Sequence, residues 1–151
     1  MLRLARATAP LLVGLAGVTG SAHEHAAGTT AERMQMMKAM ATHVEALGEM
    51  LAGRKPYDGV AVQRHALALH ETCHGVADKF PDAAHDHNSR ADPAVWEKPE
   101  EFRTQMDNLQ SVVGELVTAS TSGQLEEVRS SFVALGRACT TCHETFRLPD
   151  N

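Results

Sequence analysis

The sequence predicts an all-α protein folded as an antiparallel four-helix bundle. Apolar residues recur three and four positions apart in four separate segments, which is the period of a helix with one buried face. No segment shows the two-residue period of a strand. Glycine and proline fall mostly between the periodic segments, where they end one helix and allow the next to turn back. Four amphipathic helices of this kind bury their apolar stripes against one another as a bundle.

The first two helices are expected on either side of a short turn. The first begins near Thr30 and is ended by Gly53 and Pro56, after which Asp58 supplies a side chain that can cap the second helix. The second helix is expected to continue until Pro81. The predicted first stripe comprises Met34, Met37, Ala41, Val44, Gly48 and Leu51. The predicted second stripe comprises Val62, Ala66, Leu69, Cys73, Val76 and Phe80.

A polar connection, residues 82–98, leads to the second pair of helices. Pro99 suits the first position of the third helix, where its missing N–H has no partner in any case. The third helix is broken at residues 121–123, which end in glycine. Its predicted stripe is Phe102, Met106, Leu109, Val113, Leu116 and Ser120. The predicted stripe of the fourth helix is Leu125, Val128, Phe132, Leu135, Cys139, Cys142 and Phe146.

The motif Cys139-Thr140-Thr141-Cys142-His143, close to the C-terminus, carries the most specific chemistry. Cys-x-x-Cys-His is the attachment signature of a c-type haem, in which two thiols bind one haem covalently and the histidine ligates its iron. The alternatives are a redox dithiol and half of a zinc site. A redox dithiol is expected near a βαβ pattern and a structural zinc site needs a second ligand pair, and the sequence shows neither. Because both cysteines lie on the buried stripe, we expect the haem inside the bundle.

The N-terminus has the pattern of an export signal. Arg3 and Arg6 precede an apolar run at residues 10–18, and small residues ending at Ala22 suit cleavage. We therefore predict a cleaved signal peptide at residues 1–22, a flexible tail at 23–29, a bundle domain at 30–151, and a periplasmic protein. The apolar run is shorter than the ~20 residues of a spanning helix, so no membrane span is expected in the mature chain. Cleavage would move the net charge from −5 to −7, which argues against binding to nucleic acid.

In these features the chain resembles the cytochrome c′ family, the class II c-type cytochromes, and most closely its low-spin, methionine-ligated members. The C-terminal position of the haem motif sets this family apart from the class I cytochromes, whose motif lies near the N-terminus. The resemblance covers essentially all of the mature chain. It rests on Arg33, Met37 and Lys38, on residues 55–58, on Phe80 and Pro81, on residues 93–96 with Phe102, and on Cys139, Cys142, His143, Glu144, Phe146 and Arg147.

The resemblance implies one covalent haem c with its iron, held by Cys139 and Cys142. It makes His143 the proximal axial ligand and Met37 the candidate distal ligand. Arg33 corresponds to a family arginine near the haem propionates, and Arg147 to one near the proximal histidine. The residue after Arg33 is often glutamine in the family but is Met34 here, which puts one propionate contact in doubt.

The expected function is that of a periplasmic monohaem single-electron carrier with redox proteins as partners. Its carboxylates are spread along helix faces and form no catalytic pair, so an enzyme is not expected. The main alternative is a high-spin cytochrome c′ that binds nitric oxide or carbon monoxide at an open distal site, with Met37 as part of the core. Family members often form homodimers through the first helix pair, so a homodimer is among the expected states.

A His-rich metal-binding protein is a further alternative. His70 and His74 lie four residues apart and share a helix face, and His85 and His87 follow in the polar connection. Without a further ligand, the simpler interpretation is a solvated polar face. Cys73 is the thiol left over once the haem has two, and its place on the apolar stripe predicts a buried, inert side chain.

Overall fold

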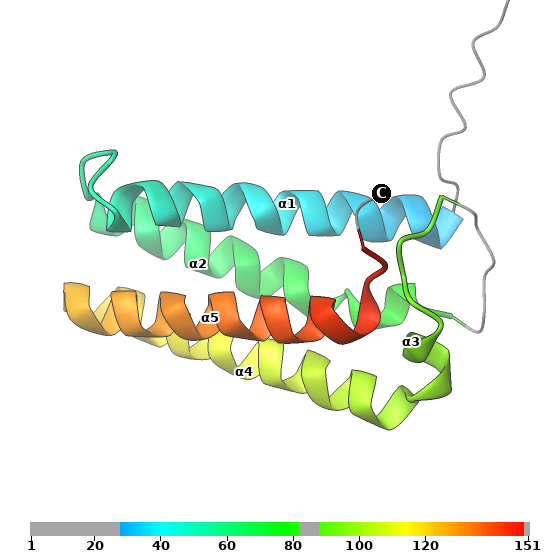
Figure 1. Ribbon diagram of the computed structural model, residues 1–151. Coiled ribbons are helices and arrows are strands. Elements are labelled where there is room, and N and C mark those ends of the chain that lie inside the picture. Colours follow the sequence, from blue (N-terminus) through cyan, green and yellow to red (C-terminus); the bar gives the residue numbers. More distant parts are fainter. Residues whose placement is uncertain (1–27, 82–87, 150–151) are drawn as a thin grey trace, which may run out of the picture.

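The computed structural model describes residues 28–81 and 88–149, which form a bundle of four long helices (Figure 1). The long helices are α1 (Gly28–Leu51), α2 (Gly59–His74), α4 (Pro99–Ser122) and α5 (Leu125–Phe146). Two short elements, η1 (Ala77–Lys79) and α3 (Ala94–Glu97), lie in the connection between α2 and α4. The predicted all-α four-helix bundle is confirmed. The predicted signal peptide, most of the predicted tail, and His85 and His87 lie outside the described residues.

Local signals set most of the helix ends. The Asp58 carboxylate accepts hydrogen bonds from the backbone N–H groups of Val60 (3.0 Å) and Ala61 (3.2 Å), so the predicted N-cap of α2 is confirmed. Pro99 is the first residue of α4, also as predicted. Gly123 follows α4 with φ of +75°, a left-handed conformation that side chains disfavour.

The connection after α2 differs from the prediction. We expected the second helix to continue to Phe80, but α2 ends at His74, where the Gly75 N–H bonds to the carbonyl of Cys73. Glycine weakens a helix interior by about 1 kcal/mol relative to alanine, and here the chain tightens into the 3₁₀ turn η1. The prediction also missed α3, which begins beside Asp92, whose carboxylate accepts from the Ala94 N–H at 2.9 Å. A helix of a single turn, such as α3, is too short to show a periodic pattern of apolar residues.

The buried face of α1 is centred one position earlier than predicted. Met34 is 50% exposed and Ala41 is also exposed, whereas Arg33 and Leu47 are buried. Met37, Val44 and Leu51 lie on both the predicted face and the observed one, which explains the partial success. The prediction failed because Arg33 is charged and does not register in an apolar pattern, although it occupies a core position.

The core consists of two clusters stacked along the bundle. The first joins all four long helices at the end where α1 turns into α2, and includes Leu47, Val62, Leu69, Leu116, Val128 and Leu135. There the Phe132 ring of α5 reaches α1, since a Cβ at Gly48 would lie 3.5 Å from it, in ordinary van der Waals contact. The second cluster, at the other end, comprises Val76, Val95, Phe102, Met106 and Phe146. Its rings stack edge to face, with centroids 4.8 Å apart for Phe80 and Phe102.

No helix among the described residues combines the length and the apolar content that crossing a bilayer requires. The isolated bridge between Ala91 and Arg147 is the only β pairing in the described part of the chain.

The cap of α2 gives a test of the fold. Replacing Asp58 with Ala removes the acceptor for two backbone N–H groups and is expected to lower the free energy of unfolding by about 1 kcal/mol. Asp58→Ser keeps an acceptor at this position and is the matched control. Chemical denaturation of both variants measures the difference, and equal stability of Asp58→Ala and the wild type would contradict the capping role.

Candidate functional site

A cavity of about 590 Å³ opens at the end of the bundle that holds the second core cluster. Its walls come from α1, α4 and α5 together with residues from the connection between α2 and α4. Its size lies within the range of pockets that take small molecules and cofactors. The lining residues are Arg33, Met34, Met37, Lys38, Phe80, Arg90, Ala91, Phe102, Met106, Cys142, His143, Phe146 and Arg147.

Helix α5 brings the haem motif to this cavity. Cys142 and His143 line it directly, and Cys139 lies one turn earlier on the same helix. Both cysteines are half-buried, with Cys139 packed against the first core cluster and Cys142 against the second. The expectation that the two thiols lie on the core face of this helix is confirmed, and the pair straddles the boundary between the clusters.

The protonation states of the motif follow from its partial burial. Burial, followed by the neighbouring Cys139, raises the pKa of the Cys142 thiol to about 11, and burial also raises the pKa of Cys139. Burial, followed by the charge of Arg147, lowers the pKa of His143. At neutral pH both thiols are therefore protonated, and the imidazole is neutral with a lone pair available for a metal.

The facing wall, formed by α1, presents methionine sulfur to the same cavity. Three methionines fall at positions 34, 36 and 37. Met36 turns away, with its methyl carbon 3.2 Å from where a Cβ at Gly75 would lie. Met34 lines the cavity but is half exposed, whereas Met37 lines it and packs against the second core cluster. Met37 is therefore the α1 thioether best held at the cavity.

The rim of the cavity is cationic. Arg33, Lys38, Arg90 and Arg147 all line it, and the described lining residues include no carboxylate. Such a rim favours an anionic ligand group, and propionates are of this kind. The sequence predicted Arg33 and Arg147 in the haem environment and both line the cavity, but it gave no role to Lys38 and missed Arg90. Arg90 lies in a connection without periodicity, so no sequence signal marks it.

Arg33 is almost fully buried, and its guanidinium connects α1 to two other segments. It donates to the carbonyl of Lys79 at 2.8 Å, to the Ser89 hydroxyl at 2.7 Å and to the Thr30 hydroxyl at 3.3 Å. It also lies over the Phe80 ring, 4.5 Å from the centroid. These contacts hold α1 in place beside the cavity.

The segment around Ala91 closes the end of the cavity by pairing with the residues that follow α5. The Asp92 N–H donates to the carbonyl of Phe146 at 3.0 Å, and the Leu148 N–H donates to that of Arg90 at 2.8 Å. The Arg90 guanidinium also donates to the Leu148 carbonyl at 2.7 Å. The pairing fixes the last turn of α5, which carries the haem motif, against the rim.

Comparison with known proteins agrees with this geometry. The cytochrome c′ family profile matches residues 29–147. The chain belongs to the cytochrome c′ family. A cytochrome c-556 from Agrobacterium tumefaciens (strain II Chrys) is 31% identical over 122 residues, 81% of this chain and 98% of that protein. A cytochrome c′ from Pararhodospirillum photometricum is 31% identical over 116 residues, 76% and 92% of the two chains.

Solved structures of family members share the fold. The cytochrome c′ from Shewanella frigidimarina matches with a TM-score of 0.75 at 20% identity, covering 78% of this chain and 91% of that one. A nitric oxide complex of a cytochrome c′ mutant from Alcaligenes xylosoxidans matches with a TM-score of 0.76 at 21% identity, covering 80% and 94%. At these identities the likeness shows the four-helix bundle alone.

Haem c with its iron is the cofactor of this cytochrome c′ family member, and the residues of the cavity fit it. One turn of α5 offers two protonated thiols and a neutral imidazole, the groups that a c-type haem requires. Aromatic and methionine side chains supply an apolar lining, and the cationic rim suits carboxylates.

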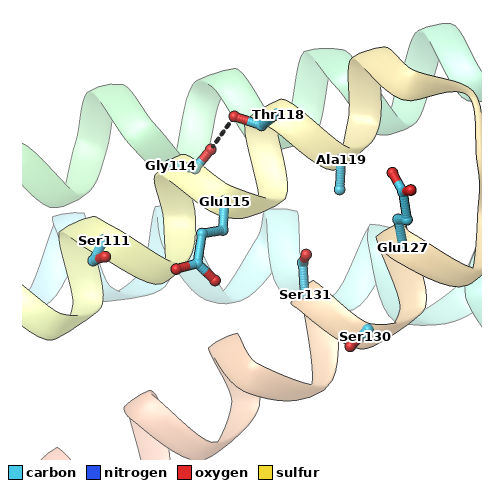
Figure 2. Close-up of a pocket in the computed structure, with 8 residues that line it drawn as sticks. All are labelled: Ser111, Gly114, Glu115, Thr118, Ala119, Glu127, Ser130 and Ser131. Carbon is cyan, nitrogen blue, oxygen red and sulfur yellow. Dashed lines mark hydrogen bonds between the residues drawn. The ribbon is translucent and has the colours of Figure 1, made fainter.

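A second hollow, of about 610 Å³, lies between α4 and α5, away from the motif (Figure 2). Hydroxyl groups and the exposed carboxylates of Glu115 and Glu127 line it. The Thr118 hydroxyl is already bonded to the Gly114 carbonyl at 3.1 Å. It shares no residue with the haem cavity, and we regard it as a solvated groove.

The other metal alternative was a site at His70 and His74. Their Nε2 atoms lie 3.2 Å apart, so the two residues do share a helix face as predicted. Among the described residues, however, no group of three or more His, Cys, Asp and Glu side chains is arranged to hold a metal ion. Cys73 is buried and free, as expected.

The buried arginine allows a test of how α1 is held. Arg33→Ala removes the three hydrogen bonds that the charged guanidinium donates to described residues and is expected to lower the free energy of unfolding by roughly 3 kcal/mol. Arg54→Ala is the matched control, because Arg54 is exposed and its ion pair with Glu49 is expected to contribute less than about 1 kcal/mol. Denaturation of the haem-loaded proteins measures both, and equal losses would contradict a structural role for Arg33.

Proposed function

We propose that this cytochrome c′ family member is a periplasmic single-electron carrier whose iron is ligated by His143 and Met37. Cys139 and Cys142 would hold the haem covalently. The observation that carries the proposal is that His143 on α5 and Met37 on α1 line one cavity from two different helices. A haem bound in this cavity would have its iron held by His143 from α5 and by Met37 from α1.

When bound, the haem supplies an iron that accepts and releases one electron. The protein residues set the conditions for this. Neutral His143 and the soft, uncharged Met37 thioether are ligands that favour the ferrous state and raise the potential. The half-buried Met37 side chain would also exclude water from that side of the iron. Arg33 and the segment around Ala91 hold the walls of the cavity in place. We therefore expect the protein to rearrange little when the iron gains or loses an electron.

The exported location follows from the N-terminal segment and from the family. Members are typically exported c-type cytochromes, and residues 1–22 have the pattern of a cleaved signal peptide. We therefore expect its electron donors and acceptors to be exported redox proteins. A homodimer through the first helix pair is part of the same proposal, since family members often pair in this way.

Gas binding is the second candidate function. Solved relatives of similar fold include cytochromes c′ with nitric oxide and with carbon monoxide bound. In this alternative Met37 is an apolar core residue and leaves the sixth position of the iron open. Its packing against the second core cluster is compatible with that role as well. The two functions therefore differ in a single bond, and a spectrum distinguishes them.

Attachment is tested by removing thiols. The exported wild-type protein is expected to keep its haem through acid–acetone extraction, because thioether bonds are covalent. The double variant Cys139→Ala/Cys142→Ala is expected to lose all extraction-resistant haem. Cys73→Ala, which removes the third, buried cysteine, is the matched control and should retain it. Covalent haem in the double variant would rule out this attachment site.

Distal ligation is tested at Met37. The wild-type ferric protein is expected to be low-spin, with a weak sulfur-to-iron band in the near infrared. Met37→Ala should open the distal side, abolish that band and raise the carbon monoxide affinity of the ferrous protein by about tenfold or more, or ~1.4 kcal/mol. Met34→Ala, which changes a more exposed methionine of the same wall, is the control and should keep the band. A wild-type protein that is high-spin in both oxidation states would favour gas binding instead.

A further inference from the structure

Two histidines from different helices meet at the seam between α1 and α2. His43 on α1 and His65 on α2 are 22 residues apart in sequence, yet their Nδ1 atoms lie 3.0 Å apart. Both side chains are half-buried, and their ring centroids are 5.2 Å apart with the planes tilted by 52°. Neither residue lines the haem cavity. The tertiary packing of the two helices therefore brings together two imidazole nitrogens that the proposed electron transfer does not use.

The separation of these nitrogens suits chelation of one metal ion. With metal–nitrogen bonds of about 2.0–2.1 Å, two ligands at a square-planar or tetrahedral angle lie roughly 2.8–3.4 Å apart. The 3.0 Å between His43 and His65 falls inside that interval. In the hydrogen bond the two nitrogens face each other, so binding a shared ion requires both rings to turn toward it, and the last torsion of histidine is soft.

The protonation state of the pair also allows ligation. In the neutral pair, one Nδ1–H donates to the other Nδ1, which accepts. A shift of the donating ring to its other tautomer moves its proton to Nε2 and leaves both Nδ1 lone pairs free, with no net change in protons.

From this geometry we infer that His43 and His65 form a second, non-haem metal site for a divalent transition metal of the Zn²⁺ class. Imidazole is a ligand that Zn²⁺, Cu²⁺ and Ni²⁺ share. The described residues contribute no third His, Cys, Asp or Glu ligand, so water completes the coordination and the ion is exchangeable.

This pair is a better site than His70 and His74. The Nε2 atoms of the latter are 3.2 Å apart, but both belong to α2, and His74 is exposed. A metal there would bind one helix. A metal on His43 and His65 would instead link α1 to α2, and α1 packs mainly on α2. The ion would therefore help to fix the helix that carries Met37 and Arg33.

Titration with Zn²⁺ tests the inference. The haem-loaded protein is titrated with ZnCl₂ in a calorimeter, alongside His43→Ala, His65→Ala and the double variant His70→Ala/His74→Ala. Each of the first two variants is expected to weaken the tightest Zn²⁺ site by about tenfold or more, since it removes one of two protein ligands. The double variant is the matched control and should keep that site. Zn²⁺ should also raise the thermal midpoint of the wild type and not that of His43→Ala.

Several results would overturn the inference. They are the absence of Zn²⁺ binding by the folded wild type, an unchanged tight site in either single variant, and loss of that site in the His70→Ala/His74→Ala control. If His65→Ala does not fold, as judged by circular dichroism and the haem spectrum, His65→Gln replaces it with a side chain of similar size. The same weakening of Zn²⁺ binding is then required of His65→Gln, and its absence counts against the site.

Discussion

The position of α1 relative to α5 is the constraint on which the candidate site depends. Helix α1 packs mainly on α2, and the Phe132 ring of α5 lies within van der Waals reach of a Cβ at Gly48, away from the haem motif. At the haem-motif end, the cavity between α1 and α5 is lined in part by the second core cluster. The hydrogen bonds of Arg33 and the pairing of the segment around Ala91 with the end of α5 keep the walls in place.

This arrangement divides the site between two helices that contact each other little. Helix α5 carries the attachment motif, whereas α1 carries the methionine of the facing wall, and α1 is positioned by α2 and η1. The distance between the two walls therefore also depends on packing at the α1–α2 seam, away from the cavity. If Met37 ligates the iron as proposed, a change in that packing would move the thioether, and the low-spin and gas-binding alternatives would differ by a small displacement of α1.

The sequence predicted the parts of this structure that depend on local chemistry. Asp58 as a cap, Pro99 as a helix start and the core-facing cysteines each follow from residues a few positions apart, and each is confirmed. The errors share a different cause. The face of α1 was misplaced because buried Arg33 is charged, and its partners at Lys79 and Ser89 lie far away in the sequence. Arg90 and the contact between His43 and His65 likewise arise from tertiary packing, which no spacing in the sequence reveals.

The core-facing position of the cysteines on α5 has a consequence for folding. A cofactor bound only by the native state stabilises that state by mass action, so its contribution falls when the protein is diluted or the cofactor is removed. The haem c of this family is covalently attached and stays with the unfolded chain. Its effective concentration relative to the core residues is then set by the length of chain between them and does not depend on the protein concentration. Folding is then a unimolecular reaction in which the ring behaves as the largest apolar side chain of the core. A chain with 4% aromatic residues can in this way enclose a well-filled interior at any protein concentration.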